Sequence, residues 1–168
     1  MIIAGVIAEF NPMHDGHRYL LQTIKEQLHP DVLIVVLSTY FSSRGLPSLE
    51  NVETKTKLAL EAGADLVIAL PSVYAMQSAD YFARYAIEAL SSAQVNILCF
   101  GSESANLHTL QQKAKQIQLL NVDPSTSLAR NAAKFDLDLQ PNDILAIQYI
   151  RWCENFNIKP YPILRDQS

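Results

Sequence analysis

An unbroken run of six apolar residues at positions 32–37, Val-Leu-Ile-Val-Val-Leu, constrains the fold of this chain more than any other feature. No polar residue interrupts the run at alternate positions, so a strand formed by it would be buried on both faces. Strands of this kind are typical of parallel sheets that helices cover on both sides. The run therefore predicts an α/β sheet and argues against an antiparallel sheet with one solvent-exposed face.

Strand-length apolar runs alternate with stretches of helical periodicity along the rest of the chain. The other predicted strands are residues 2–8, 66–70, 96–100 and 161–164, the last near an edge because prolines flank it. The predicted helices are residues 16–28, 51–62, 79–93, 107–119, 125–135 and 142–154. This alternation predicts one α/β domain over residues 1–168, a Rossmann-like parallel sheet with helices on both faces.

The tetrad His14-Asp15-Gly16-His17 stands where the first predicted strand ends and the first predicted helix begins. Ligands of such sheets bind beyond the carboxyl ends of the strands. The unpaired N–H groups and the dipole of a helix N-terminus favour an anion there. Two histidines can donate hydrogen bonds to a phosphate that gathers charge, and Gly16 lets a ligand approach the backbone. The tetrad therefore predicts a phosphate site at which His14 and His17 are catalytic.

The sequence around the tetrad carries a resemblance to a known family. Residues 8–17, AEFNPMHDGH, resemble the AEFNPFHNGH of the bacterial tRNA(Met) cytidine acetate ligases, members of the HxGH nucleotidylyltransferase superfamily. RGLP at 44–47, GADLVIALP at 63–71, FGSE at 100–103 and PNDIL at 141–145 are similar to further family blocks, in the same order. The resemblance implies an N-terminal nucleotide-binding domain of HxGH nucleotidylyltransferase type, without the family's C-terminal tRNA-binding region.

The resemblance also implies an activity and a site. In the family, ATP, with Mg²⁺ as the expected cation, activates acetate as acetyl-adenylate, and the acetyl group passes to N4 of the wobble cytidine of elongator tRNA(Met). This chain would carry the adenylation part, with Arg44 as a substrate or tRNA contact and no side-chain metal site. The residues implied to bind ATP are Ile7, Ala8, Glu9, Phe10, Asn11, Pro12, His14, Gly16, His17, Gly101, Asn142 and Arg165.

Several of these residues have an ordinary structural interpretation as well. Asn142 is suited to cap the last helix, Arg165 to be a terminal charge, and residues 101–103 to form a turn. The aromatic side chains at 81, 82 and 85 are expected in the core rather than at a base-stacking surface. Each motif follows a predicted strand, including residues 71–78, so we expect one cleft to collect them all.

Charge and cysteine content bear on partners and location. A net charge of −4 predicts weak tRNA binding by this chain alone, because RNA affinity depends on lysine and arginine neutralising phosphates. Cys99 and Cys153 lack metal-ligand spacing and are expected as buried free thiols. We expect a cytoplasmic protein with neither a membrane span nor a signal peptide.

The loop after the second strand departs from the family pattern. Residues 38–45 read STYFSSRG where the family has SGNFVQRG, which predicts an altered substrate pocket and leaves the activated acid open. Two alternatives therefore remain: another HxGH adenylyltransferase acting on a small substrate, and an ATP- or AMP-binding module without turnover.

Overall fold

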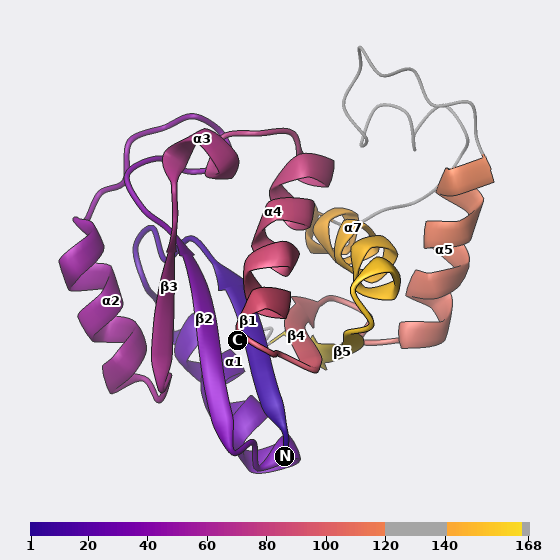
Figure 1. The fold of residues 1–168 in the computed structure, drawn as a ribbon, viewed down its shortest axis with the longest axis horizontal. Coiled ribbons are helices and arrows are strands. Elements are labelled where there is room, and N and C mark those ends of the chain that lie inside the picture. Colours follow the sequence, from indigo (N-terminus) through magenta and orange to yellow (C-terminus); the bar gives the residue numbers. More distant parts are fainter. Residues whose placement is uncertain (120–140, 166–168) are drawn as a thin grey trace.

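The computed structural model describes residues 1–119 and 141–165 (Figure 1). Its sheet has five parallel strands in the order β3-β2-β1-β4-β5. The strands are β1 (Ile3–Ala8), β2 (Val32–Ser38), β3 (Leu66–Leu70), β4 (Ile97–Ser102) and β5 (Lys159–Leu164). The described helices are α1 (Asp15–Leu28), α2 (Val52–Glu61), α3 (Ser72–Ala75), α4 (Ala79–Ser92), α5 (Leu107–Leu119) and α7 (Pro141–Asn155). The helix predicted at 125–135 lies outside the described residues.

Helices cover both faces of the sheet, as predicted. On one face, Leu21 and Ile24 of α1 and Ala59 of α2 pack against alternate residues of β1 and β2. On the other face, α4, α5 and α7 form a larger core around Ile87, Leu110 and other buried residues. Figure 1 shows the two layers, with α4 and α7 on the side facing the viewer. The prediction of an α/β sheet is confirmed.

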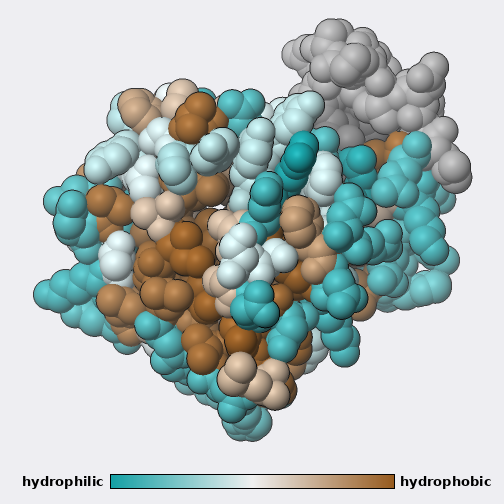
Figure 2. Space-filling model, viewed as in Figure 1, coloured by the Kyte–Doolittle hydropathy of each residue, from teal (hydrophilic) through white to brown (hydrophobic). Residues whose placement is uncertain are grey.

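The two edge strands differ from the central ones in ways that their sequences explain. β5 contains Pro160 and Pro162, which are two residues apart, so their backbone nitrogens point to the same side of the strand. That side can be the open edge of the sheet, where no N–H donor is needed, while the other side pairs with β4. β3 is less covered than β2, and Leu66 at its start is 46% exposed. Figure 2, drawn in the same view as Figure 1, shows apolar side chains gathered on the face turned to the viewer, over the strands beside α4.

The strand order places a topological switch between β1 and β4. The chain runs from β1 outward through β2 to β3, and then crosses to β4 and β5 on the other side of β1. The segments that leave β1 and β4 therefore diverge, and a crevice opens at the carboxyl ends of these two strands. This is where the histidine tetrad lies.

Other predictions have mixed outcomes. Cys99 and Cys153 are buried free thiols, and burial raises the pKa of each to about 12. The prediction of a core cluster at 81, 82 and 85 is wrong for Tyr81, which is 49% exposed, whereas Phe82 is buried. None of the helices in the described part of the chain is both long and apolar enough to span a lipid bilayer.

Candidate active site

A cleft of about 490 Å³ opens at the carboxyl ends of β1 and β4. The structure brings twelve of the thirteen predicted site residues to its lining, from five separate parts of the chain. They are Ile7, Ala8, Glu9, Phe10, Asn11, His14, Gly16, His17, Arg44, Gly101, Asn142 and Arg165. Pro12 is the exception, since it is exposed and does not line the cleft. The cleft is therefore assembled by the fold from segments that are distant in sequence.

The two tetrad histidines form the N-terminal cap of α1. His14 is the cap residue, with extended backbone, and its Nδ1 accepts a hydrogen bond from Gly16 N at 3.1 Å. In return, His17 Nδ1 accepts a hydrogen bond from His14 N at 3.3 Å. This reciprocal arrangement is a capping box in which imidazole nitrogens take the acceptor roles usually played by hydroxyl and carboxylate oxygens. The helix therefore begins at Asp15, one residue before the predicted start.

The capping box also determines where the imidazole protons are. A neutral imidazole has one donor and one acceptor nitrogen, so an accepting Nδ1 leaves the proton on Nε2. Burial, the neighbouring His14 and the positive charge of Arg165 lower the pKa of His17 to about 4. At neutral pH His17 is thus an uncharged Nε2–H donor. The rings of His14 and His17 stack with centroids 3.8 Å apart.

Residues on either side of the tetrad shape this turn. Phe10 has a positive φ of 45° and is 1% exposed, and its ring packs against that of His17 with centroids 5.0 Å apart. A buried aromatic residue in the left-handed region is uncommon and is often found at functional sites. A Cβ on Gly16 would lie 3.0 Å from His14 Cε1. The glycine therefore leaves room for the His14 ring itself.

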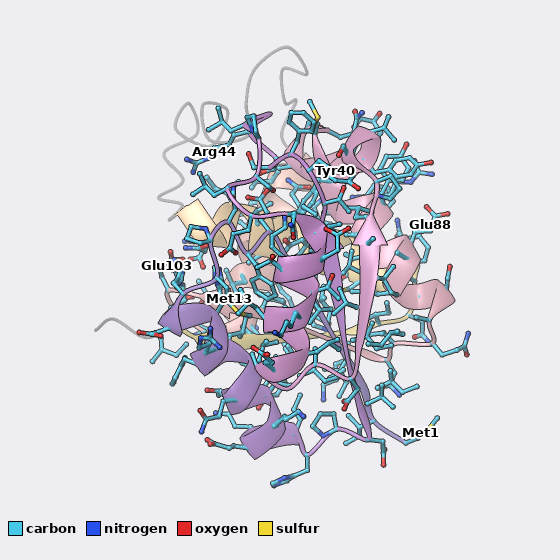
Figure 3. All side chains as sticks on the ribbon, turned by 90° about the vertical axis from the view of Figure 1, so that its left-hand side faces the viewer. Met1, Met13, Tyr40, Arg44, Glu88 and Glu103 are labelled. Carbon is cyan, nitrogen blue, oxygen red and sulfur yellow. The ribbon has the colours of Figure 1, made fainter. Side chains whose placement is uncertain are left out.

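The loop between β2 and α2 forms one wall of the cleft and is tied to the end of β1. Glu9 Oε1 accepts a hydrogen bond from Ser43 N at 2.6 Å, and Asn11 Oδ1 accepts one from Leu49 N at 2.7 Å. These bonds hold the segment that carries Arg44 at the mouth of the cleft. Figure 3 shows Arg44 on the same side of the molecule as Glu103.

Lys55 of α2 is a buried cation that holds the β2–α2 loop, and our sequence reasoning missed it. Its side chain is fully buried, and its Nζ donates to Ser38 O at 2.6 Å and Thr39 O at 2.8 Å. Ser48 Oγ and Glu9 O lie within 3.2 Å of the same nitrogen. Burial lowers the pKa of Lys55, although Glu9 and Glu50 oppose this shift. A lysine in a helical pattern gives no sequence signal of such burial.

The opposite wall joins β4, β5 and α7. Asn142, in the first turn of α7, donates from Nδ2 to Glu103 Oε1 at 2.6 Å. Arg165 follows β5, its N–H donates to Ser102 O, and its guanidinium lies 3.7 Å from the same Glu103 oxygen. Arg165 is thus placed by β-sheet pairing and is more than a terminal charge. The absence of a side chain at Gly101 leaves room for the side chain of Arg165, because a Cβ added at Gly101 would lie 3.2 Å from Arg165 Cγ.

An apolar group lines the floor of the cleft, and we did not predict it as part of the site. It includes Phe82 of α4, Phe100 of β4 and two residues of α7, Leu145 and Tyr149. Burial raises the pKa of Tyr149, so its hydroxyl is neutral. The α7 residues follow Asn142 at intervals of three and seven, which places them on one helix face. That spacing is a signal from which both could have been found.

Two further expectations need correction. Residues 71–78 do not line the cleft, because they follow β3, an edge strand two places from the switch point. Thr39 and Tyr40 do not line it either. Thr39 is buried and its Oγ1 donates to Leu70 O, while Tyr40 is 60% exposed. Of the altered loop at 38–45, residues 42, 43 and 44 line the cleft, and Leu46 follows them there.

Comparisons with known proteins agree with this geometry. The family model described as HIGH Nucleotidyl Transferase matches residues 1–168. A tRNA(Met) cytidine acetate ligase of Caldicellulosiruptor bescii is 35% identical over 98% of this chain and 46% of its own length. One of Clostridium novyi is 43% identical over 74% of this chain and 31% of its own. The chain thus spans about half the length, or less, of these curated relatives.

Solved structures give the same result. The crystal structure of Thermotoga maritima TmcAL bound with alpha-thio ATP superposes with a TM-score of 0.84 at 29% identity, covering 99% of this chain and 47% of that one. The apo form of the same protein has a TM-score of 0.82. The tetrad at the N-terminus of α1, the five-stranded parallel sheet and a family match over all 168 residues lead to one conclusion: this chain belongs to the HIGH nucleotidyl transferase family.

Proposed function

We propose that this chain binds ATP in the cleft and carries out the adenylation half of a tRNA(Met) cytidine acetate ligase reaction. The observation that carries the proposal is the placement of His14 and His17 as paired Nε2–H donors at the N-terminus of α1, opposite Arg165. The similarity to a protein crystallised with an ATP analogue supports the choice of nucleotide.

The cleft offers different chemistry to different parts of ATP. The start of α1 provides the positive end of the helix dipole and two imidazole Nε2–H donors, which suit phosphate oxygens, while the helix cap occupies the N–H groups of Gly16 and His17. The guanidinium of Arg165 also suits a phosphate. The apolar floor at Phe100, Leu145 and Tyr149 suits a purine ring. We therefore place the triphosphate at α1 and the nucleoside between β4 and α7.

The proposed reaction has two balanced steps. An acetate oxygen attacks the α-phosphorus of ATP, the bond from that phosphorus to the oxygen bridging to the β-phosphate breaks, and pyrophosphate leaves. The N4 amine of cytidine then attacks the acetyl carbonyl, AMP leaves, and the amine loses a proton. In the first step His14 and His17 would donate to oxygens whose charge grows, and such preorganised donors act mainly on the transition state. Arg44, at the mouth of the cleft, would contact acetate or the tRNA.

Mg²⁺ is the cation that we expect to accompany a triphosphate substrate, where it would neutralise part of the phosphate charge. Among residues 1–119 and 141–165, no group of three or more His, Cys, Asp or Glu side chains is arranged to hold a metal ion. We infer that phosphate oxygens and water would supply most of its ligands.

Exchange of labelled pyrophosphate into ATP, with and without acetate, tests the proposal. We expect exchange that requires acetate. Exchange supported by a different small acid would indicate another adenylyltransferase of the family. ATP binding without any exchange would indicate a binding module, and absence of ATP binding at millimolar concentration in a folded sample would refute the nucleotide site.

A further inference from the structure

Glu103 connects the two cleft residues that come from the C-terminal part of the chain. Its Oε1 accepts from Asn142 Nδ2 at 2.6 Å and lies 3.7 Å from an Arg165 nitrogen. Glu103 itself does not line the cleft, whereas both of its partners do. It therefore stands behind two groups that face the nucleotide.

The ionisation state of Glu103 determines which end of the Asn142 amide faces the ligand. Burial raises the pKa of Glu103, but hydrogen bonds from Asn142 and the backbone, with the charge of Arg165, outweigh this, and the pKa lies below its ordinary value. An ionised carboxylate can only accept hydrogen bonds, so Asn142 has to present its NH₂ group to Glu103. Its Oδ1 is then turned away from Glu103 as an acceptor.

We propose that Glu103 is a positioning residue, which orients Asn142 so that its Oδ1 accepts a hydrogen bond from an N–H or O–H donor of the nucleoside. This inference rests on the proposed function. The donor is either a ribose hydroxyl or the exocyclic amine of adenine. Glu103 contributes to nucleotide selectivity without touching the nucleotide.

A purely structural role for Glu103 can be separated from this one because a second bond joins the same two elements. Ser102 Oγ donates to Asp143 Oδ1 at 2.8 Å, which also ties the end of β4 to the first turn of α7. Ser102→Ala is therefore the matched control: it loosens the same junction and leaves the Asn142–Glu103 bond in place.

The test measures dissociation constants for ATP, 2′-deoxy-ATP, 3′-deoxy-ATP and purine riboside triphosphate, which lacks the exocyclic amine. We expect the wild type to bind one of the three analogues about 5- to 10-fold more weakly than ATP, the value of one hydrogen bond. Glu103→Ala and Asn142→Ala should both abolish that difference. Ser102→Ala should retain it. Glu103→Gln can donate to Asn142 as well as accept from it, so it no longer determines the orientation of the amide and should weaken the difference.

Several outcomes would overturn the inference while leaving the proposed function intact. They are wild-type discrimination in Glu103→Ala, equal loss of discrimination in Ser102→Ala, and the absence of any discrimination by the wild type. Failure of the wild type to bind ATP at all would instead remove the proposed function. A thermal unfolding curve for each variant establishes that it is folded.

Discussion

Replacing His17 by alanine separates its proposed catalytic role from its role in the helix cap. The substitution removes an Nε2–H donor from the cleft, and loss of one preorganised donor typically costs ~10²–10³ in rate. It also removes the 3.3 Å bond to His14 N and the ring contacts with His14 and Phe10. Those losses together amount to about 1–2 kcal/mol of folding stability.

The expected loss of rate is too large to result from the expected loss of folding stability. A domain with at least ~5 kcal/mol of stability retains more than about 99% folded protein after losing 2 kcal/mol. The expected fall in melting temperature is roughly 2–8 °C. A hundredfold loss of acetate-dependent pyrophosphate exchange at 25 °C would therefore be a loss of chemistry.

Exchange, ATP affinity and thermal unfolding should be measured on one preparation. We expect ATP affinity to fall much less than exchange, because His14, Arg165 and the dipole of α1 remain to bind the ground state. His108→Ala is the matched control, since His108 is exposed on α5 and does not line the cleft, and it should leave all three quantities unchanged. Near-wild-type exchange by His17→Ala would refute the catalytic role of this residue.

Four further predictions use other features of the site. Gly16→Ala should lower exchange about tenfold with little loss of stability, because the added Cβ crowds the His14 ring while alanine favours the helix; unchanged exchange would contradict the fit. Lys55→Met should lower the free energy of unfolding by about 2 kcal/mol in urea titrations, since buried carbonyl groups of 38 and 39 lose their donor. His17 has a pKa of about 4 when folded and 6.5 when unfolded, so the unfolded state takes up the extra proton as the pH falls through this range. The full shift would correspond to about 3 kcal/mol, which solvent screening of this partly exposed ring reduces, so wild-type stability should drop over the range by at least about 1 kcal/mol more than that of His17→Gln. At physiological salt, filter binding should give a tRNA dissociation constant of ~10⁻⁴–10⁻⁶ M or weaker, and submicromolar binding would reveal a recognition surface.

Local patterns were sufficient to predict the regular elements. The run at 32–37 identified a strand that is buried from Leu33 onward, and the described helices α1, α2, α4, α5 and α7 begin and end within one residue of the predicted bounds. Helix α3 was missed because four residues after Pro71 are too few to show a helical period. Tyr81 was misplaced for a different reason. Neighbouring aromatic positions on a helix point in different directions, and Tyr81 lies on an exposed face while Phe82 points into the core.

The tetrad could be predicted from its place between a strand and a helix, whereas Gly101, Asn142 and Arg165 were implied only by the resemblance to a known family. The tetrad, Gly101, Asn142 and Arg165 all come from short segments at strand or helix ends, and the fold brings them to one cleft. Lys55 could not be predicted, because its burial depends on the loop of residues 38–48 folding over it from outside α2. The orientation of the Asn142 amide likewise depends on Glu103, 39 residues away. Contacts between segments far apart in sequence leave no periodic signal.

The capping box couples the stability of α1 to the chemistry proposed for the cleft. Both imidazole Nδ1 atoms accept backbone hydrogen bonds, so the bonds that begin the helix also hold both protons on Nε2. A serine at the cap and a glutamate at the third helical position would stabilise the helix equally well, but would leave a negative charge where phosphates are expected. Histidine satisfies both requirements only while it is neutral, and the low pKa of His17 ensures this at physiological pH. The environment that lowers this pKa, burial beside His14 and Arg165, is therefore part of the proposed catalytic apparatus.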